Sequence, residues 1–198
     1  MANMSHISTN SPHAWILAAR PKTLTGAAVP VMIGISAAWA DGFFRPVPAL
    51  LCFLFAFFMQ IDANFINDYY DFRKGLDDEK RLGPKRACAE GWITLPAMRR
   101  GIVCTTLLSC LTGLPLVWYG GWTMVLVCCV VFCFLYTTCM ARLGLGDLLV
   151  LVFFGLVPVG ATYYLQSGTV VPEVWALSLA CGLVIDCLLV VNNYRDRD

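Results

Sequence analysis

Long apolar segments separated by short polar connections dominate this chain. Six segments are long enough to cross a membrane, since a spanning helix needs about 20 mostly apolar residues. They are residues 23–40, 47–70, 101–119, 121–140, 146–166 and 173–194. Only the connection at residues 71–100 is long. The pattern predicts an all-α, polytopic transmembrane bundle over residues 15–198, preceded by a polar tail at residues 1–14, whose first dozen residues we expect to be disordered.

The composition supports lipid as the solvent of this chain. Apolar residues make up 59% of the sequence and charged residues 14%, whereas a soluble domain is roughly half apolar and a quarter charged. Most of the ten cysteines lie inside the apolar segments, and neither histidine does. We interpret the cysteines as reduced packing residues rather than as disulfides or metal ligands.

The distribution of cations predicts the orientation. If six helices alternate, the N-terminus, residues 71–100, the turn near Arg142 and the C-terminus share one side of the membrane. That side carries every Lys and Arg except Arg45, which is 13 of 14. Cytoplasmic loops are the ones enriched in Lys and Arg. We therefore expect a protein of the cell inner membrane with its N-terminus in the cytoplasm.

A polar stripe ends the second apolar segment. Asn64, Asn67, Asp68 and Asp71 follow the i, i+3, i+4, i+7 spacing that places residues on one helical face. Polar groups at membrane depth are costly and tend to face a bundle interior or a water-filled cavity. The spacing therefore predicts a functional stripe that leads inward from the cytoplasmic edge.

A second, shorter cluster ends the sixth segment on the same predicted side. Asn192 and Asp196 repeat the i, i+4 spacing. Two such clusters facing each other would suit Mg²⁺, which prefers oxygen ligands and commonly bridges to phosphate oxygens. Basic residues of the 71–100 loop could then close over a polyanion.

Several polar residues leave more than one interpretation open. Asp77 and its acidic neighbours, taken alone, are typical of a solvated helix end. Asp62 and Asp186 lie within apolar segments, where they would tune a site, pair with a neighbour or stay protonated. Arg20 and Lys22 fit either a membrane anchor or a contact to a diphosphate.

With these residues in view, the chain resembles the UbiA superfamily of intramembrane aromatic prenyltransferases. The similarity rests on "ARPKTL", "NDYYDFRKGLDDEKRLGPKR", "GWIT" with "MRRG", "LGLGDLLVLVFFGLVPVGATYYLQSG" and "VVNNYRD". It is strongest to the menaquinone-pathway branch, which prenylates 1,4-dihydroxy-2-naphthoate. The resemblance implies nine helices, of which this chain would supply the first six.

The resemblance also implies a Mg²⁺-dependent reaction between a polyprenyl diphosphate and an aromatic quinol precursor, within the lipid bilayer and without nucleic acid. The implied metal ligands are Asn67, Asp71, Asp77, Asn192 and Asp196. The implied substrate-binding residues are Arg20, Lys22, Asn64, Asp68, Tyr70, Lys85, Arg86 and Arg142. Candidate catalytic residues are Asp71, Asp196 and Lys22.

Three departures from the family pattern bear on these expectations. The second acidic motif would continue with an acid four residues past Asp196, but the sequence ends at Asp198. The connection after the fourth segment is short and lacks a Gly-Pro stretch, and Asp62 and Asp186 occupy positions expected to be neutral. The metal site is therefore expected to be incomplete, and three outcomes stay open: a chain that is inactive alone, a site completed by a C-terminal complement or another copy, or a chain that is part of a longer protein.

Other functions remain open at this stage. The aromatic acceptor could be 4-hydroxybenzoate, homogentisate or a heme- or chlorophyll-type ring. A CDP-alcohol phosphotransferase would need an Asp-Gly-x-x-Ala-Arg motif, which the sequence lacks. A transporter would distribute polar residues through the depth of the bundle, whereas these gather at one edge.

Overall fold

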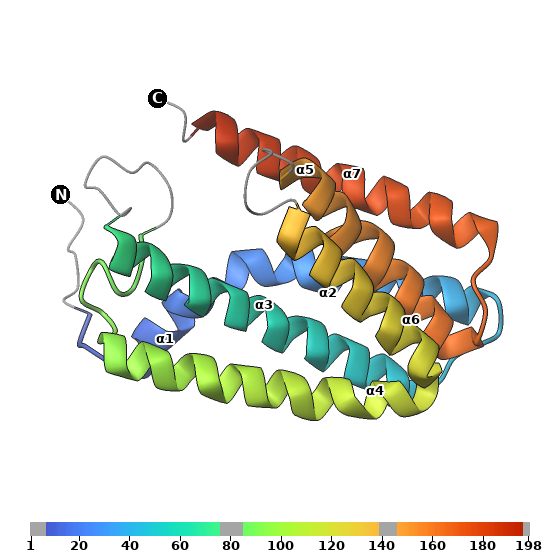
Figure 1. Cartoon of the computed structure of the whole chain (residues 1–198), viewed down its shortest axis with the longest axis horizontal. Coiled ribbons are helices and arrows are strands. Elements are labelled where there is room, and N and C mark those ends of the chain that lie inside the picture. The colour runs from blue at the N-terminus through green and yellow to red at the C-terminus, as the bar shows by residue number, and fades with distance from the viewer. Residues whose placement is uncertain (1–6, 76–84, 139–145, 196–198) are drawn as a thin grey trace.

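The computed structural model describes residues 7–75, 85–138 and 146–195. Within these ranges every regular element is a helix (Figure 1). Four helical stretches are long and apolar enough to cross a membrane: Pro21–Ala40, Pro46–Lys74, Leu95–Gly121 and Asp147–Ser167. The predicted all-α transmembrane bundle is thereby confirmed, and the chain is a multi-pass membrane protein.

The first helix, α1 (Pro12–Ala19), was not predicted from the sequence. Ser11 caps it by accepting a hydrogen bond from the Ala14 amide at 3.2 Å, and Pro12 starts its first turn. The segment before it is also fixed, because the Asn10 amide donates to the Trp92 carbonyl at 2.7 Å. The expectation of a disordered tail is therefore wrong for residues 7–12, whose polar character reflects capping rather than disorder.

Helix α2 (Pro21–Ala40) follows α1 after one residue, Arg20, whose backbone lies in the left-handed region at φ 51°. Helix α3 (Pro46–Lys74) returns along the bundle and ends at Gly75, where φ is 64°. A left-handed residue at this position satisfies the last helical carbonyls, and glycine adopts it without steric cost.

Helix α4 (Leu95–Thr138) consists of two arms, of which Leu95–Gly121 is long and apolar enough to cross a membrane. The backbone reverses at Gly121, where φ is 70° and ψ is 172°, and the second arm runs back along the bundle (Figure 1). The predicted segments 101–119 and 121–140 correspond to these two arms. The chain continues through α5 (Gly146–Val150), the π-helical turn η1 (Leu151–Leu156) and α6 (Val157–Ser167), which together make the next pass.

The π-helical turn lies just before a proline, Pro158 in α6, which removes one hydrogen bond of the α-helical pattern. Pro158 has no backbone N–H to donate to the Phe154 carbonyl. The Cys181 thiol of α7 lies 3.7 Å from that carbonyl oxygen instead. The sequence predicts a span here but not its local widening.

Helix α7 (Pro172–Arg195) completes the bundle and approaches η1 closely. A Cβ added to Gly155 would lie 2.6 Å from the Ser178 carbonyl oxygen and 2.7 Å from the Gly182 Cα. Small residues permit this backbone approach, which is a common device of helix packing in membranes. The C-terminal ends of α3 and α7 lie at the same end of the bundle (Figure 1).

The opposite end of the bundle is closed by polar contacts. The Tyr163 hydroxyl donates a hydrogen bond to Asp41 Oδ2 at 2.7 Å. The Arg45 amide donates to Gln166 Oε1 at 2.6 Å, and the Arg45 guanidinium lies 5.4 Å from the centroid of the Tyr119 ring. These contacts hold the turn between α2 and α3 against α6 and α4.

Candidate functional site

The last three turns of α3 carry the polar stripe, and its members differ in their environments. Asn64 and Asp68 are buried, Asp71 is partly exposed and the Asn67 side chain is exposed. Residues 64 and 71 lie about 10 Å apart along the helix axis at 1.5 Å per residue. The stripe thus runs from the packed interior to the rim, as the spacing predicted.

Asn64 attaches α3 to the turn between α1 and α2. Its Nδ2 donates to the Ala19 carbonyl at 3.0 Å and to the Thr23 hydroxyl at 2.9 Å. Thr23 in turn donates to the Arg20 carbonyl at 2.9 Å. These bonds fix the turn that carries Arg20 and Lys22 beside the stripe, and Lys22 itself is exposed.

Asp68 attaches α3 to the segment that precedes α4. Its carboxylate is 1% exposed and accepts hydrogen bonds from the Ala87 amide at 2.8 Å and the Cys88 amide at 3.0 Å. Both oxygens are therefore engaged by the backbone. A buried carboxylate held by two amide donors is well satisfied, which explains how it is tolerated without a cation.

Arg86 connects the same segment to the outer part of the stripe. Its Nη1 donates to the Asn67 carbonyl at 2.7 Å, and its Nη2 forms an ion pair with Asp71 Oδ2. The Arg86 side chain is 8% exposed and that of Asp71 28% exposed. A carboxylate and a guanidinium are thus placed side by side at the end of α3.

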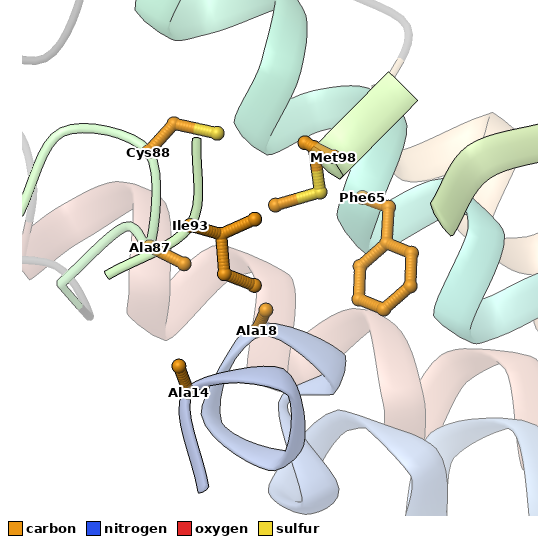
Figure 2. Packing of buried hydrophobic residues seen from close by; sticks show 7 residues of the cluster. All are labelled: Ala14, Ala18, Phe65, Ala87, Cys88, Ile93 and Met98. Carbon is orange, nitrogen blue, oxygen red and sulfur yellow. The ribbon is translucent and has the colours of Figure 1, made fainter. Parts of the chain in front are cut away.

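A small apolar cluster supports this arrangement from below. Ile93 and Met98 pack with Phe65 of α3, with Ala14 and Ala18 of α1, and with Ala87 and Cys88 (Figure 2). Trp15 meets Phe65 edge to face, with ring centroids 5.3 Å apart. The cluster joins α1, α3 and the segment before α4 into one unit, so the backbone that carries Arg86 is fixed by packing.

Asp62, two residues before the stripe begins at Asn64, serves the contact between α3 and α4. It is 6% exposed and accepts hydrogen bonds from the hydroxyls of Thr105 and, at 3.0 Å, Thr106. Of the interpretations left open, pairing with a neighbour is the one that the structure shows. For Asp186 in α7, Oδ1 is buried and has no hydrogen-bond partner in the described part of the chain.

Of the remaining predicted site residues, some are described by the structure and others lie outside the described ranges. Tyr70 is exposed, with its ring edge to face against Tyr69 at 5.4 Å, and Lys85 pairs with Glu90 at 2.8 Å. Asn192 lies near the end of α7, where only its backbone is described. Asp77, Arg142 and Asp196 lie outside the described residues.

Two of the predicted metal ligands, Asn67 and Asp71, have side chains that the structure describes. Within the described ranges, no three His, Cys, Asp or Glu side chains gather closely enough to hold a metal ion. Asn67 and Asp71 nevertheless offer an amide and a carboxylate oxygen one turn apart at the rim, the donor types that Mg²⁺ prefers. The donor chemistry fits the predicted metal, while the other predicted ligands lie beyond the described side chains.

Sequence analysis did not predict helix α1 or the hydrogen-bond partners of Asn64 and Asp68. A sequence signal existed for the helix only. Ser11 followed by Pro12 is an N-cap and first-turn signature that predicts α1. The partners of Asn64 and Asp68 are mostly backbone groups, which no side-chain pattern reveals.

Comparison with known proteins identifies the family. A model of the UbiA prenyltransferase family matches residues 27–198. The chain belongs to the UbiA prenyltransferase family. The resemblance stated from the motifs is thereby confirmed.

Curated members of the family are about one third identical to this chain over the aligned residues. A 1,4-dihydroxy-2-naphthoate octaprenyltransferase of Escherichia coli is 36% identical over 98% of the chain, and one of Haemophilus influenzae is 33% identical over 92%. UbiA prenyltransferase domain-containing protein 1 of Danio rerio is 30% identical over 93% of the chain. The chain spans 66%, 63% and 57% of these three relatives.

Proposed function

We propose that this protein transfers a polyprenyl group from polyprenyl diphosphate to 1,4-dihydroxy-2-naphthoate and so contributes to demethylmenaquinone formation. Family membership and the names of the bacterial relatives support this proposal. The observation that carries it is the placement of Asp71, a carboxylate suited to a hard cation, directly beside Arg86, a cation suited to a diphosphate.

In this proposal Mg²⁺ is held by Asn67 and Asp71, together with the predicted ligands Asp77, Asn192 and Asp196. When bound, Mg²⁺ would neutralise charge that develops on the leaving diphosphate. Among the described contacts, Asp71 has one partner, Arg86, which pairs with its Oδ2. The other carboxylate oxygen, Oδ1, is the one that would bind the metal in this proposal.

The cations around the stripe bind and orient the diphosphate. Arg86 is fixed by the Asn67 carbonyl and by the apolar cluster beneath it, so its charge is preorganised. Arg20 and Lys22 lie on the turn that Asn64 holds against α3. Lys85, Tyr70 and Arg142 remain candidates for the outer part of this contact.

Asn64 and Asp68 have positioning roles in this account. Both were predicted to bind substrate, but their polar atoms already hold neighbouring backbone segments. They act through the turn at Arg20 and through the segment that carries Arg86.

The chemistry would then need little from the protein beyond placement. The allylic C–O bond breaks and its electron pair leaves with the diphosphate. The electron-rich ring of the acceptor then forms a C–C bond to the allylic cation, and the carboxylate of the acceptor leaves as CO₂. The apolar walls of the bundle keep water from capturing the cation. The alternation predicted from the sequence puts this end of the bundle in the cytoplasm, because it leaves Arg45 as the one Lys or Arg of the 14 on the other side.

An acceptor-competition assay tests the proposal. Inner membranes containing the protein are supplied with polyprenyl diphosphate, Mg²⁺ and labelled 1,4-dihydroxy-2-naphthoate, 4-hydroxybenzoate or homogentisate. A chimera that adds the last third of the Escherichia coli relative is assayed beside it. Prenylation of the naphthoate in either protein supports the proposal; a preference for another acceptor, or turnover in neither despite correct membrane insertion, contradicts it.

A further inference from the structure

A groove on the outer side of α3 and α4 has no role in the proposed reaction. Its volume is about 690 Å³, and Tyr69 of α3 and the first three turns of α4 line it. The lining residues are Tyr69, Leu95, Pro96, Arg99, Arg100, Val103, Cys104 and Leu107. Its size lies within the range of sites for small organic ligands.

The mouth of the groove is strongly cationic. Arg99 and Arg100 are exposed, and neither has a hydrogen bond or ion pair among the described residues. A third guanidinium, that of Arg73, lies over the Tyr69 ring at 5.7 Å from its centroid. No acidic side chain lines the groove, so this mouth is complementary to an anion.

The floor of the groove continues as an apolar track along α4. Val103, Leu107, Leu111 and Leu114 are 55%, 58%, 66% and 68% exposed, and their spacing places them near one helical face. From residue 103 to residue 114 the helix rises about 16 Å, close to half of the ~30 Å hydrocarbon core. The track thus matches the depth of one acyl chain in one leaflet.

We propose that this groove binds an anionic phospholipid. The phosphate lies among Arg73, Arg99 and Arg100 at the membrane surface, and one acyl chain follows Val103 to Leu114. A soluble phosphate would use the mouth but not the apolar track, and a zwitterionic lipid would use the track but gain little from three guanidinium groups. An anionic lipid uses both.

A general attraction of interfacial arginines to a charged membrane is the competing explanation. It would act on every exposed cation at this end of the bundle, including Lys74, which is exposed and does not line the groove. Arg73 does not line the groove either, but its guanidinium lies over the ring of the lining residue Tyr69, a contact that is not among those described for Lys74. Lys74→Gln is therefore the matched control for Arg99→Gln and Arg100→Gln.

Photocrosslinking in nanodiscs distinguishes these explanations. The full chain is embedded in phosphatidylcholine with one quarter phosphatidylglycerol, and each lipid in turn carries a photoactivatable acyl chain. We expect phosphatidylglycerol to label residues 95–114 several-fold more than phosphatidylcholine. Since one cation near the surface contributes about 1 kcal/mol, Arg99→Gln or Arg100→Gln should each reduce that preference about fivefold. Leu107→Asn should reduce labelling by both lipids.

Four results would overturn the proposal. They are equal labelling by the two lipids, an equal effect of Lys74→Gln and Arg99→Gln, loss of labelling on addition of inorganic phosphate, and crosslinking of α4 to a second copy in place of lipid. Monodispersity and unfolding temperature establish folding of each variant. If a variant does not fold, the ratio of the two lipids on the unmodified protein decides the question.

Discussion

Arg86 forms an ion pair with Asp71 while the same guanidinium donates to the Asn67 carbonyl. One side chain therefore joins the segment before α4 to two positions of the polar stripe. The contact places opposite charges next to each other at the rim of the bundle, where a metal ion and a diphosphate would meet. The predictions below concern this contact and the packing that positions it.

Arg86→Lys should destabilise the protein although it preserves charge. A lysine ammonium cannot reproduce the planar fork that reaches both partners, so one contact is lost from a buried position. We expect a decrease of about 1.5–3 kcal/mol in the free energy of unfolding, the range for a hydrogen bond to a charged group. Chemical denaturation in detergent measures it.

The control for this substitution is Lys85→Arg, at the residue that precedes Arg86 in the chain. Lys85 is exposed and its ion pair with Glu90 lies at the surface, where such pairs contribute little. Equal stabilities of Arg86→Lys and the unmodified protein would show that the double contact of Arg86 does not hold this segment.

Asp68→Asn should disturb the segment before α4 without changing the shape of the side chain. The amide can accept one of the two backbone hydrogen bonds, but its NH₂ faces the other donor. We expect a loss of about 1–3 kcal/mol in unfolding free energy. Hydrogen exchange should also be faster at the Ala87 and Cys88 amides.

Glu90→Gln is the control for Asp68→Asn because it makes the same acid-to-amide change at an exposed position. Its stability and exchange rates should match those of the unmodified protein. Unchanged exchange at residues 87 and 88 in Asp68→Asn would contradict the positioning role.

The polar stripe of α3 was predictable from the sequence, but the contacts of its side chains were not. The period of Asn64, Asn67, Asp68 and Asp71 predicted one polar face correctly, since periodicity is a local property of the helix. The sequence could not show that Asn64 and Asp68 face backbone groups from distant segments, because backbone donors carry no residue signature.

The fold likewise has features that the sequence predicted and features that it missed. Apolar length predicted six spans, and among the described residues four helical stretches are long and apolar enough to cross a membrane. Gly121 lies at the turn expected between two of the predicted segments. The capped helix α1 and the π-helical turn η1 were missed, because each depends on one or two residues rather than on a repeating pattern. Pairing of Asp62 with Thr105 and Thr106 joins two helices and needed the tertiary structure.

Gly155→Ala should be strongly unfavourable for packing of η1 against α7. Its Cβ would lie 2.6 Å from a carbonyl oxygen and 2.7 Å from the Gly182 Cα, both backbone atoms that cannot rotate away. Overpacking of this kind costs about 1–3 kcal/mol. Thermal unfolding of the purified protein measures the effect.

Gly26→Ala in α2 is the matched control. There a Cβ would meet only the Phe154 ring, at 4.0 Å, and alanine favours the helix by about 1 kcal/mol over glycine. A Gly155→Ala protein as stable as Gly26→Ala would show that the two backbones are not in contact.

Tyr163→Phe should weaken the closed end of the bundle. It removes the hydroxyl that donates to Asp41 and leaves that carboxylate without the bond. We expect a decrease of about 1–3 kcal/mol in unfolding free energy, with catalytic turnover preserved because the contact lies at the end opposite Asp71. Tyr164→Phe, one residue on, should change neither quantity; equal effects of the two substitutions would argue against the Asp41 contact.

The central claim is that Asp71, at the end of α3, belongs to a magnesium–diphosphate site. The most direct test is Mg²⁺-dependent prenyl transfer by Asp71→Asn, compared with Glu173→Gln, an exposed acid in the first turn of α7. Loss of a group that stabilises charge in the transition state typically costs about 100-fold or more in rate. We predict a loss of that size for Asp71→Asn, with membrane insertion intact, and unchanged turnover for Glu173→Gln. Turnover of Asp71→Asn within about threefold of the unmodified protein, at the same dependence on Mg²⁺, would contradict the account.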